Sequence, residues 1–336
     1  MEARPDVELK IVSVVASACI GDGGCFALQF DRREPLHADV VLLATACGLP
    51  ASAPTGALAP FDVVPPDRLA NAKSIALIGS GLTMVDVLLS ARRDGFQGKA
   101  TVISRRGQLP RPHAAKGVAQ QEIGLARSKR VSGLTSTIAI GCVAAEAHGT
   151  PWQAIINGLR SSMQDIWQGL PVEEQARFLR HVRPLWDRPS LNSAWRHPCN
   201  GQAMAMWRNR VERDGESFKL ITTRHGATQA EVMTTDLAFN CTGHRADLVS
   251  PLIRSLVEQG MAREDAHQLG LGVLPNGQVS SKSGTPTRSL FALGPLCQGS
   301  LWDITAVPEI VRQCDQAAES IAVLDRATTR KMELYA

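Results

Sequence analysis

Residues 75–86 read IALIGSGLTMVD, four apolar residues followed by two glycines around a serine and then by an amphipathic run. An apolar strand, a glycine turn and a helix in this order are typical of a dinucleotide-binding fold. Gly79 permits a sharp turn out of the strand, and Gly81 lets a diphosphate approach the amides at the helix start. The stretch therefore predicts a Rossmann-type α/β unit; a purely structural turn is the alternative.

The residues around this turn complete a strand–helix–strand unit of the expected size. The strand SIALI begins at residue 74, and a second strand, ATVIS, covers residues 100–104. The third glycine of the usual pattern is replaced by Met84. Helical spacing predicts that the helix faces the sheet with an apolar stripe, made of Leu82, Val85, Leu88 and Leu89.

The end of the second strand indicates which nucleotide binds. An NAD site has a carboxylate about 20 residues after the glycines, which accepts hydrogen bonds from the ribose hydroxyl. This chain has Ser104, Arg105 and Arg106 at that place, and guanidinium groups suit a 2′-phosphate. We expect NADPH rather than NADH, with two solvated arginines as the alternative. The predicted NADPH-binding residues are Gly79, Ser80, Gly81, Leu82, Thr83, Ser104, Arg105 and Arg106.

Other segments flank this unit. Residues 9–45 alternate apolar runs with polar or glycine-rich turns and predict an antiparallel β-meander, and residues 49–66 read as a linker rich in proline, alanine and glycine. Residues 150–213 are predicted to be mainly helical, and further strands are predicted from residue 217. A closing helix begins near Thr305, with an apolar face predicted at positions 307, 310, 311, 314, 318 and 321.

Composition excludes several classes of function. The 336 residues carry a net charge of +4, and the scattered basic residues argue against nucleic-acid binding. The eight cysteines include no C-x-x-C pair, which argues against a zinc site or a dithiol centre and favours a reducing cytoplasm. No run approaches the ~20 apolar residues of a membrane-spanning helix. Residues 11–20 are the one candidate for an export signal, but acidic residues precede them, so a strand is the better interpretation.

Several stretches together resemble a known family. They are IGSGLTMVDVLLS, TVISRRGQLPRPH, RFLRHVRPLWD, FNCTG and LFALGP with GSLWDITAVPEI. They are similar to the bacterial FAD/NAD(P)-binding proteins, which include amino-acid N-hydroxylating flavin monooxygenases. The resemblance implies an α/β, two-dinucleotide-binding (Rossmann-type) flavoprotein architecture with an antiparallel β-meander, in which an NAD(P) domain interrupts the FAD domain.

This layout gives the expected domains and the FAD-facing residues. The domains are a partial FAD-binding domain at 1–58, an NAD(P)-binding domain at 72–150, a helical substrate-side region at 151–232, a return to the FAD domain at 233–325 and a tail at 326–336. The resemblance implies flavin contacts at Thr242, Gly243, Gly294, Pro295, Trp302, Thr305 and Ala306. From the residues alone, Trp302 could equally be core.

One departure from the family bears on function. No strand–GxGxxG–helix segment precedes residue 75, so the FAD domain is expected to be incomplete. The chain would then be a truncated product, one half of a split enzyme that needs a separate N-terminal half, or the product of a start site placed too late.

The resemblance implies a flavin-dependent NADPH oxidoreductase, with NADPH and FAD as cofactors, a small-molecule substrate, and O₂ as a further electron acceptor if it is a monooxygenase. The alternative is an inactive remnant that acts as a binding module. A flavin-free reductase that uses a catalytic tyrosine is disfavoured, because the one tyrosine is Tyr335 in the tail. No protein side chain is assigned a catalytic role, since the cofactors perform the chemistry, and His113, His181 and His244 are expected to be structural.

Overall fold

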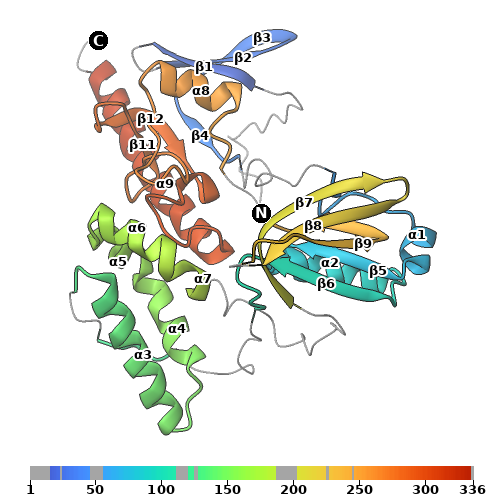
Figure 1. The fold of residues 1–336 in the computed structure, drawn as a ribbon. Coiled ribbons are helices and arrows are strands. Elements are labelled where there is room, and N and C mark those ends of the chain that lie inside the picture. Colours follow the sequence, from blue (N-terminus) through green and yellow to red (C-terminus); the bar gives the residue numbers. More distant parts are fainter. Residues whose placement is uncertain are drawn as a thin grey trace. The chain divides into compact units, whose positions relative to one another are not determined.

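The computed structural model describes residues 16–22, 25–45, 56–110, 120–124, 128–186, 203–224, 227–243 and 246–333. The chain divides into two compact units (Figure 1). We call Leu49–Arg245 the inserted unit, and Met1–Gly48 together with Ala246–Ala336 the outer unit. His113 and His244 lie outside the described residues. No helix in the described parts of the chain is long and apolar enough to cross a membrane.

A six-stranded sheet forms the centre of the inserted unit, in the order β10-β5-β6-β7-β8-β9. The first four strands of this order run parallel, and β7, β8 and β9 form an antiparallel meander. The strands are β5 (Ser74–Ile78), β6 (Lys99–Ser104), β7 (Ala203–Asp214), β8 (Ser217–Arg224), β9 (Glu231–Thr235) and β10 (Leu237–Asn240).

The predicted strand–turn–helix–strand unit is present here. Helix α2 (Leu82–Arg93) connects β5 to β6, and the short α1 (Pro66–Asn71) precedes β5. Residues 75–78 are at most 1% exposed, as expected of a strand inside a parallel sheet.

The predicted inward stripe of α2 was partly wrong. Leu82 and Leu89 are 45% and 46% exposed. The turn at Gly81 sets the rotation of the helix so that a neighbouring arc faces the sheet, and its buried residues are Met84, Val85, Val87, Leu88 and Ala91.

The domain boundaries differ from the expected ones. Strand β10 pairs with β5, so the segment that carries FNCTG lies in the sheet of the inserted unit, not in the returning FAD segment at 233–325. Residues 203–214 form β7, although the sequence leaned helical as far as residue 213. The reason is that β7 pairs along its length with β8. Local periodicity does not reveal such a tertiary contact.

Helices α3 to α7 lie between β6 and β7 in the sequence. They are α3 (Val131–Ala147), α4 (Gln153–Leu159), the 3₁₀ turn η1 (Arg160–Ser162), α5 (Met163–Gly169), α6 (Val172–His181) and α7 (Arg183–Trp186). They start within the range expected for the NAD(P) domain, 72–150, and continue into the expected helical region.

The outer unit contains two small sheets. One is the expected antiparallel meander β1-β2-β3; in the other, of order β11-β12-β4, β12 runs parallel to β4. Helix α8 packs on β1, where the Ser255 hydroxyl accepts the Cys19 amide at 3.0 Å. The elements are β1 (Ala16–Asp22), β2 (Cys25–Phe30), β3 (Arg33–Ala38), β4 (Val41–Leu43), α8 (Pro251–Glu258), β11 (Gln278–Ser280), β12 (Pro286–Ala292), the 3₁₀ turn η2 (Gly294–Cys297) and α9 (Val307–Glu333).

The closing helix α9 is present, but its predicted inward face was largely wrong. Glu309, Gln313 and Ala317 are at most 5% exposed. The expected apolar positions 307, 311, 314 and 318 are instead exposed. The hydrogen bonds of Gln313 to the end of β12 fix which side of the helix is buried.

Candidate functional site

The carboxyl ends of β5, β6 and β10 meet at the glycine turn. The Gly79 amide donates to the Ile103 carbonyl at 2.8 Å, and the Cys241 amide donates to the Ile78 carbonyl at 2.6 Å. Gly79 has φ +106°, and a β-carbon there would collide with the carbonyl group of Cys241. Glycine is therefore required at residue 79 both by its dihedral angle and by the close approach of β10.

Gly81 differs from Gly79 in its surroundings. It is the N-cap of α2, with φ −83°, and no side-chain oxygen caps the helix. A β-carbon at Gly81 would meet no atom of the described residues within 4 Å. The first amides of a helix have no intrahelical acceptor and carry partial positive charge. The start of α2 therefore faces open space with the chemistry of an anion site.

Ser104, the last residue of β6, and the two arginines that follow it lie at the same edge of the sheet, because Ile103 pairs with Ile78 in the parallel register. The Ser104 hydroxyl accepts the Gly107 amide at 3.1 Å and shapes the turn. Arg105 and Arg106 are exposed. The Arg106 guanidinium donates to the Arg180 carbonyl at 3.3 Å, which links this loop to α6.

The turn after β10 belongs to the same cluster of strand ends. Asn240 is buried, and its Oδ1 accepts the Thr242 amide at 3.2 Å and the Thr242 hydroxyl at 2.7 Å. Gly243 has φ +87°. The sequence grouped Thr242 and Gly243 with the flavin contacts, but the structure brings them to the glycine turn. Sequence reasoning missed Asn240, although an asparagine two residues before a threonine is a signal for this turn.

The other expected flavin contacts lie in the outer unit, around the loop between β12 and α9. Gly294 has φ +68°, and its amide donates to Gln313 Oε1 at 2.8 Å. Gln313 Nε2 donates in turn to the Ala292 carbonyl at 3.1 Å. Pro295 follows in η2. Sequence reasoning missed Gln313, which holds this loop to α9.

The remaining expected contacts separate into core and surface. Trp302 is 2% exposed, and the nearby residues Leu301 and Ile304 are at most 1% exposed. Thr305 is exposed and Ala306 half-buried, and the Ala306 carbonyl accepts the Ile310 amide at 3.1 Å as α9 begins. Of these expected contacts, Thr305 is therefore the exposed one near the start of α9.

The buried thiols are unsuited to nucleophilic or redox chemistry. Desolvation raises the pKa of Cys241 to about 12 and that of Cys297 to about 12. The Cys297 thiol donates to the Ala292 carbonyl at 3.0 Å. Both thiols stay protonated near neutral pH, and a protonated thiol is a poor nucleophile. Among the described residues, no group of three His, Cys, Asp or Glu side chains could hold a metal ion.

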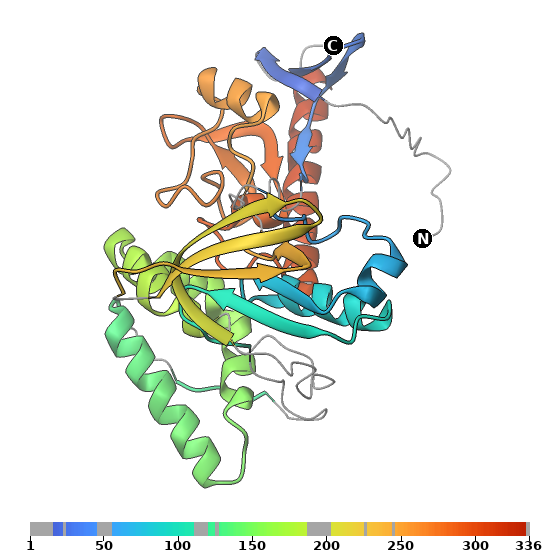
Figure 2. The same cartoon turned by 45° about the vertical axis from the view of Figure 1, so that its right-hand side comes forward.

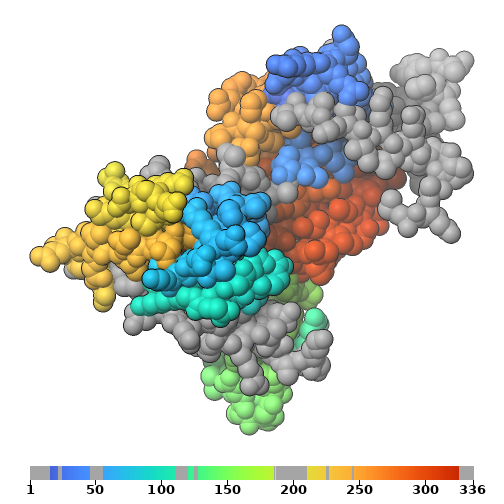
Figure 3. All heavy atoms as spheres, turned by 90° about the vertical axis from the view of Figure 1, so that its right-hand side faces the viewer, coloured from blue at the N-terminus to red at the C-terminus, as the bar shows by residue number. Residues whose placement is uncertain are grey.

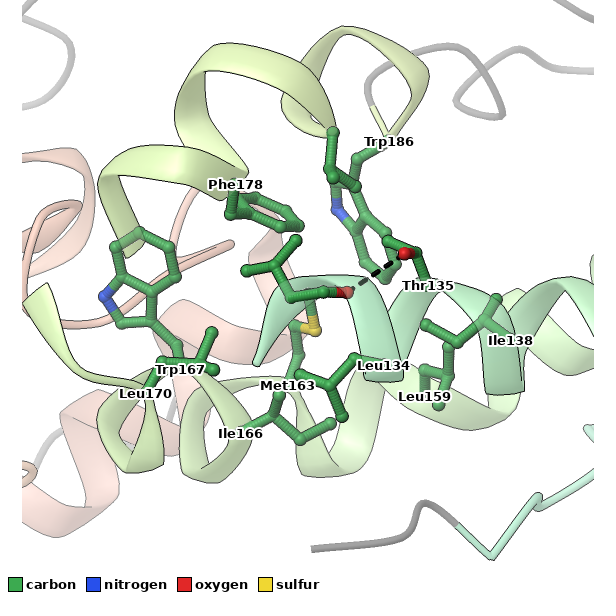
Figure 4. Close-up of a pocket in the computed structure, with 12 residues that line it drawn as sticks. Leu134, Thr135, Ile138, Leu159, Met163, Ile166, Trp167, Leu170, Phe178 and Trp186 are labelled. Carbon is green, nitrogen blue, oxygen red and sulfur yellow. Dashed lines mark hydrogen bonds between the residues drawn. The ribbon is translucent and has the colours of Figure 1, made fainter. Parts of the chain in front are cut away.

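An apolar cavity of about 40 Å³ lies among α3, α5, α6 and α7 (Figure 4). Phe178 packs edge-on against Trp167, with ring centroids 5.7 Å apart. The Thr135 hydroxyl turns back to the Val131 carbonyl at 2.9 Å, so it does not offer a hydrogen bond to the cavity. A small hole with such a lining stays dry, and it offers no group for proton or hydride transfer.

Comparison with known proteins gives a fold-level result. No family model matches the sequence, and no curated protein matches it. Solved structures do match. Over 92% of this chain and 71% of the other, the structure is similar to ornithine N-hydroxylase from Kutzneria sp. 744 with reduced FAD, NADP⁺ and L-ornithine, at 11% identity and a TM-score of 0.52. The chain has the two-dinucleotide-binding flavoprotein fold.

Two further structures with this fold match at lower TM-scores. The reduced ornithine hydroxylase of Pseudomonas aeruginosa has 12% identity and a TM-score of 0.48 over 89% of this chain and 68% of that one. Thioredoxin reductase of T. acidophilum has 12% identity and a TM-score of 0.48 over 92% of this chain and 74% of that one. The similarity to the Kutzneria hydroxylase confirms the expected two-dinucleotide-binding (Rossmann-type) architecture, and an identity this low shows the fold alone.

Proposed function

We propose that this chain is a flavin-dependent NADPH oxidoreductase, in which the inserted unit binds NADPH and the outer unit contacts FAD. The observation that carries the proposal is the uncapped start of α2 at Gly81, which opens onto free space where β5, β6 and β10 end. The Kutzneria hydroxylase, which has this fold, holds FAD and NADP⁺ together, and that supports the same pair of cofactors here.

The residues of the inserted unit fit NADPH. The amides from Ser80 to Thr83 would hold the diphosphate, since Gly81 offers no side chain that would block its approach. Thr242 and Gly243 would line the opposite side of the turn. Arg105 and Arg106 are exposed at the end of β6, where guanidinium groups would bind a 2′-phosphate through charge-assisted hydrogen bonds.

The described residues of the outer unit fit FAD only in part. Thr305 and Ala306 lie beside the start of α9, whose positive end suits an anionic reduced ring. The Gly294 amide is already bound to Gln313. Among the described residues of this unit, no glycine turn leads from a strand directly into an α-helix, as it does at Gly79–Leu82.

With NADPH and FAD bound, the two cofactors would supply the hydride-transfer chemistry. The chain's own residues bind and orient the nucleotide, and we assign no side chain a catalytic role. The substrate is proposed to be a small molecule. If O₂ were the acceptor, with one oxygen atom entering the substrate and the other leaving as water, the activity would be that of a monooxygenase.

The partial fit of FAD also favours a second candidate. In that case the chain is an NADPH-binding module, inactive until a separate half completes the flavin site. Flavin absorbance separates the two candidates: the first requires that purified protein bind FAD and that NADPH bleach its visible band. Colourless protein that takes up no FAD but still binds NADPH supports the second.

The nucleotide preference tests the NADPH site itself. Replacing Arg105 and Arg106 with alanine should weaken NADPH binding about 10- to 100-fold, because charge-assisted hydrogen bonds contribute about 1.5–3 kcal/mol. NADH, which lacks the 2′-phosphate, should bind as before. Arg210→Ala is the matched control, since that side chain is 72% exposed and pairs with Glu212 on β7. An unchanged ratio of NADPH to NADH affinity would refute the assignment of Arg105 and Arg106 to the 2′-phosphate.

A further inference from the structure

Helix α3 of the inserted unit is apolar around most of its circumference. Among its 17 residues, the only charged side chain is Glu146. Leu134 and Ile138 point into the apolar cavity (Figure 4), and on this side α3 packs against α4 and α6. A helix that is apolar all round is normally buried all round. The side of α3 that faces away from the cavity is therefore the one that needs an explanation.

That outer side of α3 is exposed. Its exposed uncharged residues, which we call the α3 stripe, are Ser136, Ala139, Ile140, Val143, Ala144 and Ala147. At about 100° per residue they span about 140° of the helix circumference, and the middle of the stripe lies about 170° from Leu134 and Ile138. Ile140 and Val143 are 70% and 68% exposed. Figure 2 shows α3 (green) along the outside of the helical region, and Figure 3 shows this green region at the surface.

The α3 stripe carries no charge, unlike the exposed side of a neighbouring helix. Glu146 lies about 90° around the helix from the middle of the stripe. On α6, by contrast, Glu173, Arg177 and Arg180 are exposed, which is the usual composition of a helix face in water. Contiguous exposed apolar surface marks interaction sites. The composition of the stripe therefore indicates a contact surface.

The order of side chains in the α3 stripe is symmetric about the midpoint between Gly141 and Cys142. A twofold axis at this midpoint would pack two antiparallel α3 helices with identical contacts on each copy. The facing pairs are then Ile140 with Val143, Ala139 with Ala144, and Ser136 with Ala147. Large side chains meet large ones and small side chains meet small ones, so the spacing of the two helix axes can stay even along the contact.

Charge does not oppose this pairing. Glu146 of one copy lies level with Thr137 of the second copy, about 13 Å along the helix axis from the other Glu146. Exposed like charges at that separation are largely screened at physiological ionic strength. The α3 stripe is therefore complementary to itself in both shape and charge.

We propose that the α3 stripe is the contact surface of a homodimer, in which α3 packs antiparallel against α3 of a second copy of this chain. A standard stable interface has ~20–30 residues on each partner, and the stripe is much smaller. We therefore expect a dimer that dissociates on dilution, with a Kd of about 1–100 μM. The inference is independent of the proposed function, because α3 holds none of the residues assigned to NADPH or FAD.

A membrane surface or an unrelated protein fits the α3 stripe less well. Helices that lie in a membrane interface carry Lys and Arg on their polar face, whereas the one charged residue of α3 is acidic. Complementary charges help to fix the register of an unrelated partner, and the stripe offers none. Its symmetric order of side chains is instead what a second copy of the same helix matches.

Sedimentation velocity of the purified chain tests the dimer. We expect the average mass of the wild type to rise from that of a monomer toward that of a dimer between about 1 and 300 μM. Ile140→Lys would place a charge against Val143 of the second copy and should weaken the dimer at least tenfold. Val232→Lys, at a position of β9 that is 58% exposed, is the matched control and should leave the dimer unchanged.

Two results would overturn the proposal. One is a wild-type chain that stays monomeric throughout this concentration range, whether or not it binds phosphatidylcholine vesicles. The other is an equal effect of Ile140→Lys and Val232→Lys on the dimer. NADPH affinity should be the same in both variants and the wild type, so a failure of the proposed NADPH site would be seen separately.

Mixed disulfides test the antiparallel register. The exposed Cys25 and Cys314 are first replaced by serine, and a chain with Ile140→Cys is mixed with a ¹⁵N-labelled chain that carries Val143→Cys. With oxidised glutathione, mass spectrometry should show the mixed disulfide forming at least tenfold faster than between Ile140→Cys and Ala147→Cys chains. Ala147 is on the same stripe but about 6 Å out of register. Equal rates for the two mixtures would overturn the antiparallel pairing.

Discussion

Gly79 and Cys241 approach so closely that the Cys241 carbonyl group occupies the place of a β-carbon at residue 79. The contact joins the carboxyl end of β5, the first strand of this sheet along the chain, to the carboxyl end of β10, the last. At the opposite end of the same two strands, the amide and the hydroxyl of Ser74 donate to Asp236 Oδ2 at 2.8 and 3.1 Å. The glycine turn is thus shaped by β10 as well as by its own sequence.

Gly79→Ala should destabilise the inserted unit by about 2 kcal/mol or more, because alanine is strained at φ +106° and must displace the backbone of β10. Thermal unfolding measures the change. Gly95→Ala is the control: Gly95 has a similar φ of +102°, but the nearest atom to its added β-carbon is 3.5 Å away. If both variants lower the free energy of unfolding by the same amount, the contact with Cys241 contributes nothing to the stability of the inserted unit.

Gln313→Leu should destabilise the outer unit by about 2–4 kcal/mol. It leaves the Gly294 amide and the Ala292 carbonyl without their partner in a buried site. Denaturant unfolding should show this loss, while Gln316→Leu, at an exposed position of the same helix, should be nearly neutral. NADPH binding should be retained in both variants. A Gln313→Leu protein as stable as wild type would show that the loop does not depend on this side chain.

Cys241 and Cys297 should resist thiol reagents at pH 8, whereas the exposed Cys25 and Cys314 react. The physical cause is burial, which raises both buried pKa values to about 12. A thiol ionises more readily in the unfolded chain, with a pKa near 9.0, so the stability contribution of these groups is complete below pH 9 and decreases as pH rises toward 12. Mass spectrometry after labelling identifies the modified residues. Rapid modification of Cys241 or Cys297 in folded protein would contradict their burial.

Much of the inserted unit could be predicted from the sequence, because its determinants are local. The strand at 74–78, the turn at Gly79 and the helix that follows are encoded within some 20 consecutive residues. Neighbours distant in sequence determine the parts that were missed. The rotation of α2 depends on the turn geometry, and the place of Thr242 depends on the pairing of β10 with β5.

The buried face of helix α9 also could not be predicted from local sequence alone. Its apolar stripe was predicted to face the interior, but positions 307, 311, 314 and 318 are exposed. Gln313 is buried in its place because its side chain satisfies the end of β12, a role that hydrophobic periodicity cannot register.

Titration calorimetry of NADPH into wild-type protein and Gly81→Ala tests the central claim most directly. The variant keeps an allowed φ of −83° and meets no atom within 4 Å, so it should fold normally and weaken binding at least about tenfold by placing a methyl group where the diphosphate lies. Gly169→Ala, which also meets no atom within 4 Å, should leave the affinity unchanged. Wild-type protein that takes up no NADPH at saturating concentration, or a Gly81→Ala variant that binds it equally well, would contradict the account.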